Sequence, residues 1–230
     1  MYVANGTAAP PADGWVAAQL DGLVRVTGAA GVPARGITLQ GLAFMHTRTT
    51  HLEPFTVPSG GDMSFHDGGA VRLQGTENCA VRGSLFRNLG GSGVMIAGYN
   101  ADADVDGNEF VFVGESAVMA MGLGGDRQNN LDGDVPTRTA VTNNFAHEFG
   151  LYVKQTGFFY QAMSANSSIL NNVFFNGPRA GINISEQSDR GLHARARARL
   201  PPTARLARRR RLRRRPHHEE ERRVQPRQVR

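Results

Sequence analysis

The sequence predicts an all-β solenoid, in which short strands stack coil upon coil, followed by a basic tail. Three observations indicate this. A short motif recurs at a period in the twenties, which is typical of solenoids. Apolar residues alternate with a period of two, which favours strands over helices. Gly and Asn separate the apolar stretches, as turns require, and no segment carries a convincing helical stripe.

The recurring motif is a hexad of the form aliphatic, any, Gly or Asn, any, any, Phe. The five copies are Leu39–Phe44, Val81–Phe86, Val105–Phe110, the looser Val141–Ala146, and Ile169–Phe174. Two copies agree over a longer stretch, because LFRNLGGSGVMI from Leu85 aligns without a gap with EFVFVGESAVMA from Glu109. Each coil would supply two or three short strands that stack in parallel on the next coil.

This register predicts which side chains share a column. Val81, Val105 and Ile169 would form an aliphatic column, and the Phe residues of the hexads an aromatic one. Asn at the turns suits left-handed backbone angles, and stacked Asn side chains can form hydrogen bonds along the axis. A leucine-rich repeat is the competing solenoid, but its leucine ladder is absent. A single-stranded parallel β-helix of about five or six coils over residues 1–185 is the better interpretation.

Several stretches resemble the right-handed parallel β-helix of the pectin-lyase-like superfamily, and more closely a family of large β-helix proteins of microbes and algae. These stretches are VPSGGDMSFHDGGAVRLQGTENC, GVMIAGYNADADVDGNEF, GLYVKQTGFFYQA and NNVFFNGPRAGIN. The resemblance runs from about Gly36 to Asn183 and implies a right-handed helix, a polysaccharide hydrolase or lyase activity, and a secreted or cell-surface location. The N-terminal residues MYVANGTAAPPADGW nevertheless lack a signal-peptide pattern.

The family motif breaks at Ile184-Ser-Glu-Gln, and the charge of the chain changes there. Residues 1–189 hold 10 Lys and Arg against 17 Asp and Glu, a net of −7, whereas residues 190–230 hold 16 Arg against 3 Glu, a net of +13. One interpretation of residues 186–230 is a polybasic arm for nucleic acid. The other, which we favour, is out-of-frame sequence from a GC-rich gene, joined to a truncated β-helix. Both interpretations predict disorder.

Composition argues against an internal disulfide and against a membrane-spanning helix. Cys79 is the single cysteine, so the chain has no internal disulfide. No apolar run approaches the roughly 18 residues that a membrane span needs. The sequence leaves the oligomeric state open.

Two long connections interrupt the regular spacing, and such loops are where binding sites usually lie. The first, Gly122–Thr137, carries Asp126, Asp132 and Asp134. The second lies between Leu39 and Val81, and carries His51, Glu53, Asp62, His66 and Asp67.

Lys154 stands in the strand-like stretch HEFGLYVKQTGFFYQ, where we align it with Val94, Val118 and Ile182 of the aliphatic column. A lysine there either faces solvent after a local register change or serves a function. Gln155 is its neighbour, and His147 and Glu148 lie half a coil away.

Two chemistries suit these residues. A glycosidase needs two carboxylates roughly 5–10 Å apart, and Asp126, Asp132, Asp134, Glu115 and Glu148 are the pool. A lyase needs a base such as Lys154, and a positive group or cation that neutralises a uronate carboxylate.

The predicted catalytic residues are therefore Lys154, Glu148, Asp134 and Asp126. The predicted substrate-binding residues are His147, Gln155, Asp132 and Asp67. No metal site or cofactor is predicted, since the spacing in DRQNNLDGD is tolerable for Ca²⁺ but lacks the full EF-hand pattern.

Three functions follow. The first is a fragment of a carbohydrate-active β-helix protein that is inactive as it stands, with a polysaccharide partner. The second is a non-catalytic β-helix that binds glycans or forms a surface scaffold. The third, least favoured, is nucleic-acid binding through the tail. The sequence leaves the sugar, the linkage and the question of catalysis open.

Overall fold

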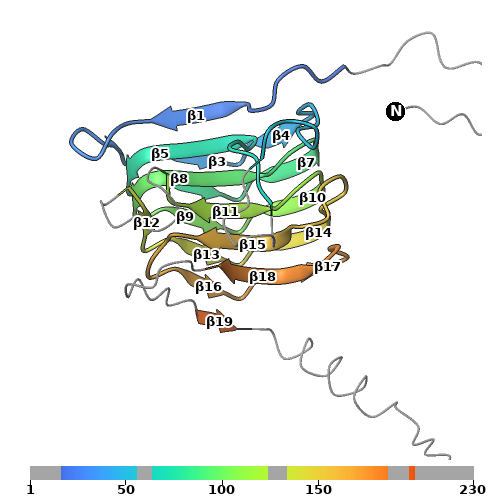
Figure 1. The fold of residues 1–230 in the computed structure, drawn as a ribbon. Coiled ribbons are helices and arrows are strands. Elements are labelled where there is room, and N and C mark those ends of the chain that lie inside the picture. The colour runs from blue at the N-terminus through green and yellow to red at the C-terminus, as the bar shows by residue number, and fades with distance from the viewer. Residues whose placement is uncertain (1–16, 56–63, 124–133, 186–196, 200–230) are drawn as a thin grey trace, which may run out of the picture. The chain divides into compact units, whose positions relative to one another are not determined.

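The computed structural model describes residues 17–55, 64–123, 134–185 and 197–199. These residues form three β-sheets and no helix, and every pairing between named strands is parallel (Figure 1). Parallel sheets are normally covered on at least one face, and their strands are accordingly apolar. The predicted all-β class is confirmed.

The strands divide among an eight-stranded, a six-stranded and a five-stranded sheet. The eight-stranded sheet comprises β1 (Val24–Thr27), β2 (Ala34–Arg35), β5 (Val71–Glu77), β8 (Val94–Ala101), β11 (Val118–Met121), β12 (Pro136–Thr137), β15 (Gly157–Ala162) and β18 (Ala180–Ser185). The six-stranded sheet comprises β3 (Thr38–Gln40), β6 (Ala80–Arg82), β9 (Asp104–Asp106), β13 (Ala140–Thr142), β16 (Ser168–Leu170) and β19 (Arg197–Arg199). The five-stranded sheet comprises β4 (Ala43–Met45), β7 (Leu85–Leu89), β10 (Glu109–Val113), β14 (Phe145–Phe149) and β17 (Val173–Phe175).

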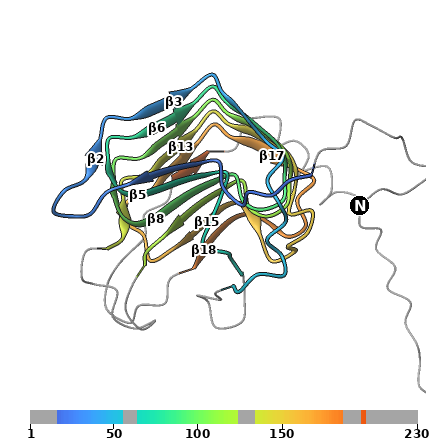
Figure 2. The same ribbon diagram turned by 90° about the horizontal axis from the view of Figure 1, so that it is seen from above.

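From β3 onward the chain visits the sheets in a repeating order: six-stranded, five-stranded, eight-stranded. Each strand pairs with its counterpart from the neighbouring repeat, so that consecutive repeats lie one on another (Figure 2). The hexad alignment sets this register, since Leu39, Val81, Val105, Val141 and Ile169 stand directly opposite one another.

A residue with positive φ stands at each corner between two sheets. At the corner from the six- to the five-stranded sheet it is the Gly or Asn of the hexad: Gly41, Gly83, Gly107, Asn143 and Asn171. At the corner from the five- to the eight-stranded sheet, these residues are His46, Asn88, Phe112, Glu148 and Asn176. Gly and Asn adopt left-handed angles readily, whereas bulkier residues such as Phe112 and Glu148 do so at a cost.

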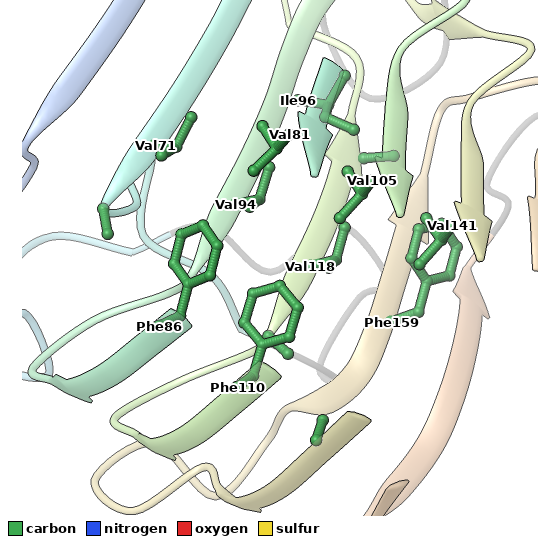
Figure 3. Close-up of a cluster of buried hydrophobic side chains, with 14 of the residues drawn as sticks. Val71, Val81, Phe86, Val94, Ile96, Val105, Phe110, Val118, Val141 and Phe159 are labelled. Atoms are coloured by element: carbon green, nitrogen blue, oxygen red, sulfur yellow. The ribbon is translucent and has the colours of Figure 1, made fainter. Parts of the chain in front are cut away.

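The interior between the sheets holds the predicted columns (Figure 3). Phe86 stacks on Phe44 with ring centroids 4.7 Å apart and on Phe110 at 4.6 Å, and the Phe86 and Phe110 rings are fully buried. Ala146 takes the next place in the column, and Phe174 beyond it stacks instead on Phe158 at 4.9 Å. Offset stacks of this kind add about 0.5–1.5 kcal/mol to the gain from burial. The predicted aliphatic column is confirmed, and the aromatic column is confirmed for Phe44, Phe86 and Phe110, whereas Phe174 stacks on Phe158.

The predicted asparagine ladder is also present, one position beyond the corner glycine or asparagine of the hexad. Asn108, Asn144 and Asn172 are buried, and the Oδ1 of each later residue accepts a hydrogen bond from the backbone N–H of the residue one repeat earlier, at 2.9 Å. Ser84 N–H donates in the same way to Asn108 Oδ1 at 3.0 Å. The ladder therefore satisfies backbone groups that a tight buried turn would otherwise leave unpaired.

The basic tail differs from the prediction at one place. Arg197–Arg199 form β19, which lies parallel to β16 with Ala198 opposite Ile169. These three residues of the segment predicted to be disordered thus extend the six-stranded sheet, because the free backbone edge of β16 accepts another strand. The rest of residues 186–230 lies outside the described residues.

Candidate functional site

A pocket of about 390 Å³ lies beside Asp134, at the corner where the eight-stranded sheet ends. Its walls come from the turn between β1 and β2, from the ends of β5 and β8, and from Leu123 and Asp134. Gly75 and Gly98 bend β5 and β8 here with φ values of 63° and 62°. A Cβ on Gly75 would lie 2.1 Å from the carbonyl of Gly28, so only glycine lets the turn pass this closely.

The polar side chains of this pocket are Gln74, Tyr99 and Asp134. Tyr99 Oη donates to Glu77 Oε1 at 2.5 Å, and Glu77 also accepts from Arg35 Nε at 2.8 Å. The hydrogen bond from Arg35 holds the pKa of the Glu77 carboxyl below its usual range, and the hydrogen bond to Glu77 raises the pKa of the Tyr99 phenol. Glu77 is therefore an ionised acceptor and Tyr99 a neutral hydroxyl.

A second ion pair lies next along this corner. Arg138 contacts the two oxygens of Asp102 at 2.6 and 2.7 Å, and this hydrogen bonding lowers the pKa of the Asp102 carboxyl. A carboxyl that must donate a proton in glycoside cleavage needs a raised pKa instead. Glu77 and Asp102 therefore contribute negative charge to the site and are not suited to act as the proton donor.

Asp134 is exposed, and its backbone carbonyl accepts from the Leu123 N–H at 3.2 Å. This bond closes the base of the long connection that carries the predicted carboxylates. Asp126 and Asp132 lie outside the described residues, so their roles stay predictions.

Glu148 and His147 lie at the opposite corner, where the five-stranded sheet gives way to the eight-stranded one. Glu148 Oε1 accepts from Asn176 Nδ2 at 2.6 Å, and its other oxygen contacts His147 Nδ1. These hydrogen bonds, led by that from Asn176, lower the pKa of the Glu148 carboxyl. Glu148 is thus suited to act as a base, nucleophile or acceptor, and not as a proton donor.

The alignment of Lys154 with the aliphatic column is wrong. Phe159 is the residue that stands opposite Val118 on one side and Ile182 on the other. Val113 pairs with Phe149, and Val118 pairs with Phe159. Val118 follows Val113 by five positions, whereas Phe159 follows Phe149 by ten. The five extra residues form a turn before β15, and the turn displaces Lys154 from the sheet.

Lys154 is exposed in that turn and binds the turn's own backbone. Its Nζ donates to the carbonyls of Gly150 and Leu151 at 2.9 and 2.8 Å. Its neighbour Gln155 is also exposed, and its side chain accepts a hydrogen bond from Arg179. These contacts stabilise the turn, and catalysis by Lys154 stays a prediction.

Asp67, a predicted substrate-binding residue, precedes β5 and is exposed. Arg72 holds its carboxylate through Nε at 3.1 Å and Nη2 at 3.0 Å. The carboxylate is therefore charge-balanced, although its exposed side remains open to solvent.

The structure separates the predicted catalytic residues into two groups. Lys154 and Glu148 lie where strands of the eight-stranded sheet begin, and Asp134 lies near Asn100, where β8 ends. Six residues separate Val94 from Asn100, which at about 3.3 Å per residue is roughly 20 Å. That separation exceeds the roughly 5–10 Å that two carboxylates need to act on one glycosidic bond. This separation disfavours Asp134 and Glu148 as a catalytic pair, and their catalytic roles stay predictions.

Glu115, another member of the predicted pool, lies in a buried pair that the sequence did not indicate. Its Oε1 accepts from the backbone N–H of His66, and its Oε2 contacts His66 Nδ1, both at 3.2 Å. His66 Nε2 contacts the carbonyl oxygen of Glu53 at 3.1 Å. The hydrogen bond to Glu115 raises the pKa of His66. Both side chains are buried, so the pair fastens the loop before β5 to the sheet instead of meeting a substrate.

Within the described ranges, no three His, Cys, Asp or Glu residues are grouped as a metal site would require. No helical segment in the same ranges has the length and apolarity of a membrane crossing.

No family model matches the chain, and no curated protein matches it either. A solved structure described as "Glycoside hydrolase" is similar in fold, with a TM-score of 0.60 and 14% sequence identity. The similarity covers 71% of this chain and 33% of that chain, so this chain spans about a third of the length of that protein. At this identity the likeness concerns the fold alone: stacked parallel sheets, which also occur in a carbohydrate-active enzyme.

Proposed function

We propose that this chain is part of a carbohydrate-active protein with a right-handed parallel β-helix, and that it contributes a polysaccharide-binding surface. The pocket beside Asp134 carries the proposal. There a phenol, an amide and an exposed carboxylate meet over bent strands, within about 390 Å³. Sugar hydroxyls require several such donors and acceptors, and ligand pockets are typically about 300–1,000 Å³.

Three further observations support the β-helix and its carbohydrate role. The chain visits three parallel sheets in a fixed order, an asparagine ladder runs through one corner, and the fold is similar to that of the glycoside hydrolase. Fold alone does not determine function, so the pocket carries the binding proposal.

Binding without catalysis is the form of the proposal that the described carboxylates favour. Glu77, Asp102, Asp67 and Asp104 each hold an arginine, and Glu115 is buried against His66. The hydrogen bonds from Arg35 and Arg138 lower the pKa of the Glu77 and Asp102 carboxyls, which disfavours both as proton donors. Hydrolysis or lysis through the predicted catalytic residues Lys154, Glu148, Asp134 and Asp126 is the second candidate function.

The test measures binding of the full chain to polygalacturonate, alginate, xylan, laminarin and glucomannan by affinity electrophoresis. We expect retardation by at least one polymer, and Asp134→Asn and Tyr99→Phe should weaken it. Asp104→Asn, on the six-stranded sheet, is the matched control and should leave it unchanged. Failure of all five polymers to bind, or equal effects of Asp104→Asn and Asp134→Asn, would contradict the proposal. Release of reducing ends or of unsaturated uronate from the bound polymer would favour the second candidate function.

A further inference from the structure

A second pocket, of about 290 Å³, lies at the opposite corner, between the five-stranded and eight-stranded sheets. The segment after β4 forms one wall, with His46, Thr47 and Thr49, and the turn before β15 forms the other, with Leu151 and Tyr152. Asn88 and Phe112 project from the corner itself. None of the predicted site residues lines this pocket, although His147 contacts Phe112, and Leu151 and Tyr152 belong to the turn that holds Lys154.

Glycines allow the two walls to approach each other. A Cβ on Gly90 would lie 2.2 Å from the backbone of Arg48, and a Cβ on Gly114 would lie 2.2 Å from Gly90 and 2.8 Å from the Tyr152 ring. Thr47 Oγ1 accepts from the Gly90 N–H at 2.9 Å, and the Tyr152 N–H donates to the Gly114 carbonyl at 3.0 Å. The backbone therefore fixes both walls, and the pocket is preorganised for a ligand.

Two aromatic rings at this pocket are partly exposed to solvent. Phe112 is 39% exposed and Tyr152 is 49% exposed. His51 stacks on Tyr152 with ring centroids 5.7 Å apart, and His147 meets the Phe112 ring edge-on at 6.5 Å. Neighbouring rings thus hold both aromatic side chains in place.

The backbone of Phe112 is strained, which gives a second and independent observation. Its φ is 54°, a value that bulky residues rarely adopt, while Asn88 and His46 hold the same corner position in the two preceding repeats. Strain of this kind persists where the surrounding structure enforces it, and it is concentrated at ligand sites. The left-handed angle brings an aromatic ring into the column of corner residues, between Asn88 and Glu148.

The lining also selects the kind of ligand. Among the described residues, none that lines the pocket carries a carboxylate, an ammonium or a guanidinium group. The lining offers no positive charge to neutralise a phosphate or a uronate. The C–H face of a neutral sugar can instead pack against the flat rings of Phe112 and Tyr152. The imidazole of His46, the amide of Asn88 and the hydroxyl of Thr49 match its hydroxyl groups. The volume of about 290 Å³ is close to the lower end of the roughly 300–1,000 Å³ typical of ligand pockets.

We propose that this pocket binds a neutral pyranose unit of a glycan, stacked on Phe112 and Tyr152. The inference does not depend on the Asp134 pocket, which lies at the other end of the eight-stranded sheet. It adds a neutral subsite to a protein whose other proposed pocket is lined by a carboxylate.

The test titrates the full chain with cellohexaose, mannohexaose and xylohexaose by isothermal calorimetry, with trigalacturonic acid as the charged comparison. Phe112→Asn keeps a residue that tolerates the left-handed angle and removes the ring, and Tyr152→Ala removes the second ring. Each should lower the affinity for the bound hexaose about tenfold. Phe145→Asn is the matched control, because Phe145 is 40% exposed but lies outside the pocket, and its effect should stay below about twofold.

Thermal unfolding of each variant checks that it folds, and Tyr152→Ala, in an exposed turn, keeps the test valid if Phe112→Asn does not fold. The inference is overturned if no neutral hexaose binds, if trigalacturonic acid binds more tightly, or if both ring variants bind like the wild type. Asp104→Asn, at a residue that lines neither pocket, should leave hexaose binding intact. Equal losses of hexaose binding in Asp104→Asn and Tyr152→Ala would overturn the inference.

Discussion

The side-chain amide of Asn108 donates a hydrogen bond to Oδ1 of Asn144 at 3.0 Å, although 36 residues separate the two in the chain. Asn144 in turn donates to Oδ1 of Asn172 at 2.9 Å and to the carbonyl of Val105 at 2.9 Å. Asn144 therefore connects the repeat before it to the repeat after it. All three asparagines are buried, so each of these bonds forms away from water.

We predict that Asn144→Ala lowers the free energy of unfolding by about 2–4 kcal/mol, because it leaves buried backbone and amide groups without partners. Urea unfolding followed by circular dichroism would measure the loss. Asn143→Gly is the control, since this exposed neighbour has a φ of 56° that glycine adopts freely. An equal loss in both variants would show that the corner, and not the ladder, sets the stability.

Phe110→Ala should cost about 3–5 kcal/mol, the usual range for truncating a buried phenylalanine. Its ring is fully buried and stacks on Phe86. The same denaturant titration gives the value, and Phe175→Ala, whose ring is 45% exposed, should cost less than about 1 kcal/mol. A loss below about 1 kcal/mol for Phe110→Ala would contradict the stacked core.

His66→Gln should change how stability depends on pH. Because Glu115 raises the folded-state pKa of His66 above its ordinary value of 6.5, the pair stabilises the fold fully below pH 6.5. That stabilisation is lost as the pH rises through the raised pKa. The difference in melting temperature between wild type and His66→Gln should therefore shrink as the pH rises above 6.5. Glu115→Gln should remove the same pH dependence, and a difference that grows with pH would refute the assignment.

Lys154→Met separates a structural role from a catalytic one. The substitution removes the two hydrogen bonds from Nζ to the turn, so we expect a stability loss of at most about 1 kcal/mol. Polysaccharide binding at the Asp134 pocket should not change, because that pocket lies at the other end of the sheet. If the wild type cleaves an acidic polysaccharide and a folded Lys154→Met variant does not, Lys154 is the base that the sequence predicts.

The hexads determined much of the fold by themselves. An aliphatic residue, a Gly or Asn and a Phe at fixed spacing specify an inward side chain, a left-handed corner and a second inward side chain. In the structure Val105 and Phe110 are buried, and Gly107 has a left-handed backbone angle. Such preferences depend on the residue and its close neighbours, so the sequence alone could predict the class, the register and the ladder.

Tertiary structure decided where the site residues lie. Lys154 leaves its expected column because the turn before β15 holds five more residues than its counterpart, and sequence alignment cannot show which strand position absorbs an insertion. Glu115 meets His66 across 49 residues, and Tyr99 meets Glu77 across 22. These contacts depend on the path of whole loops over the sheets. Phe112 and Tyr152 likewise meet at one pocket only because Gly90 and Gly114 let two distant segments approach.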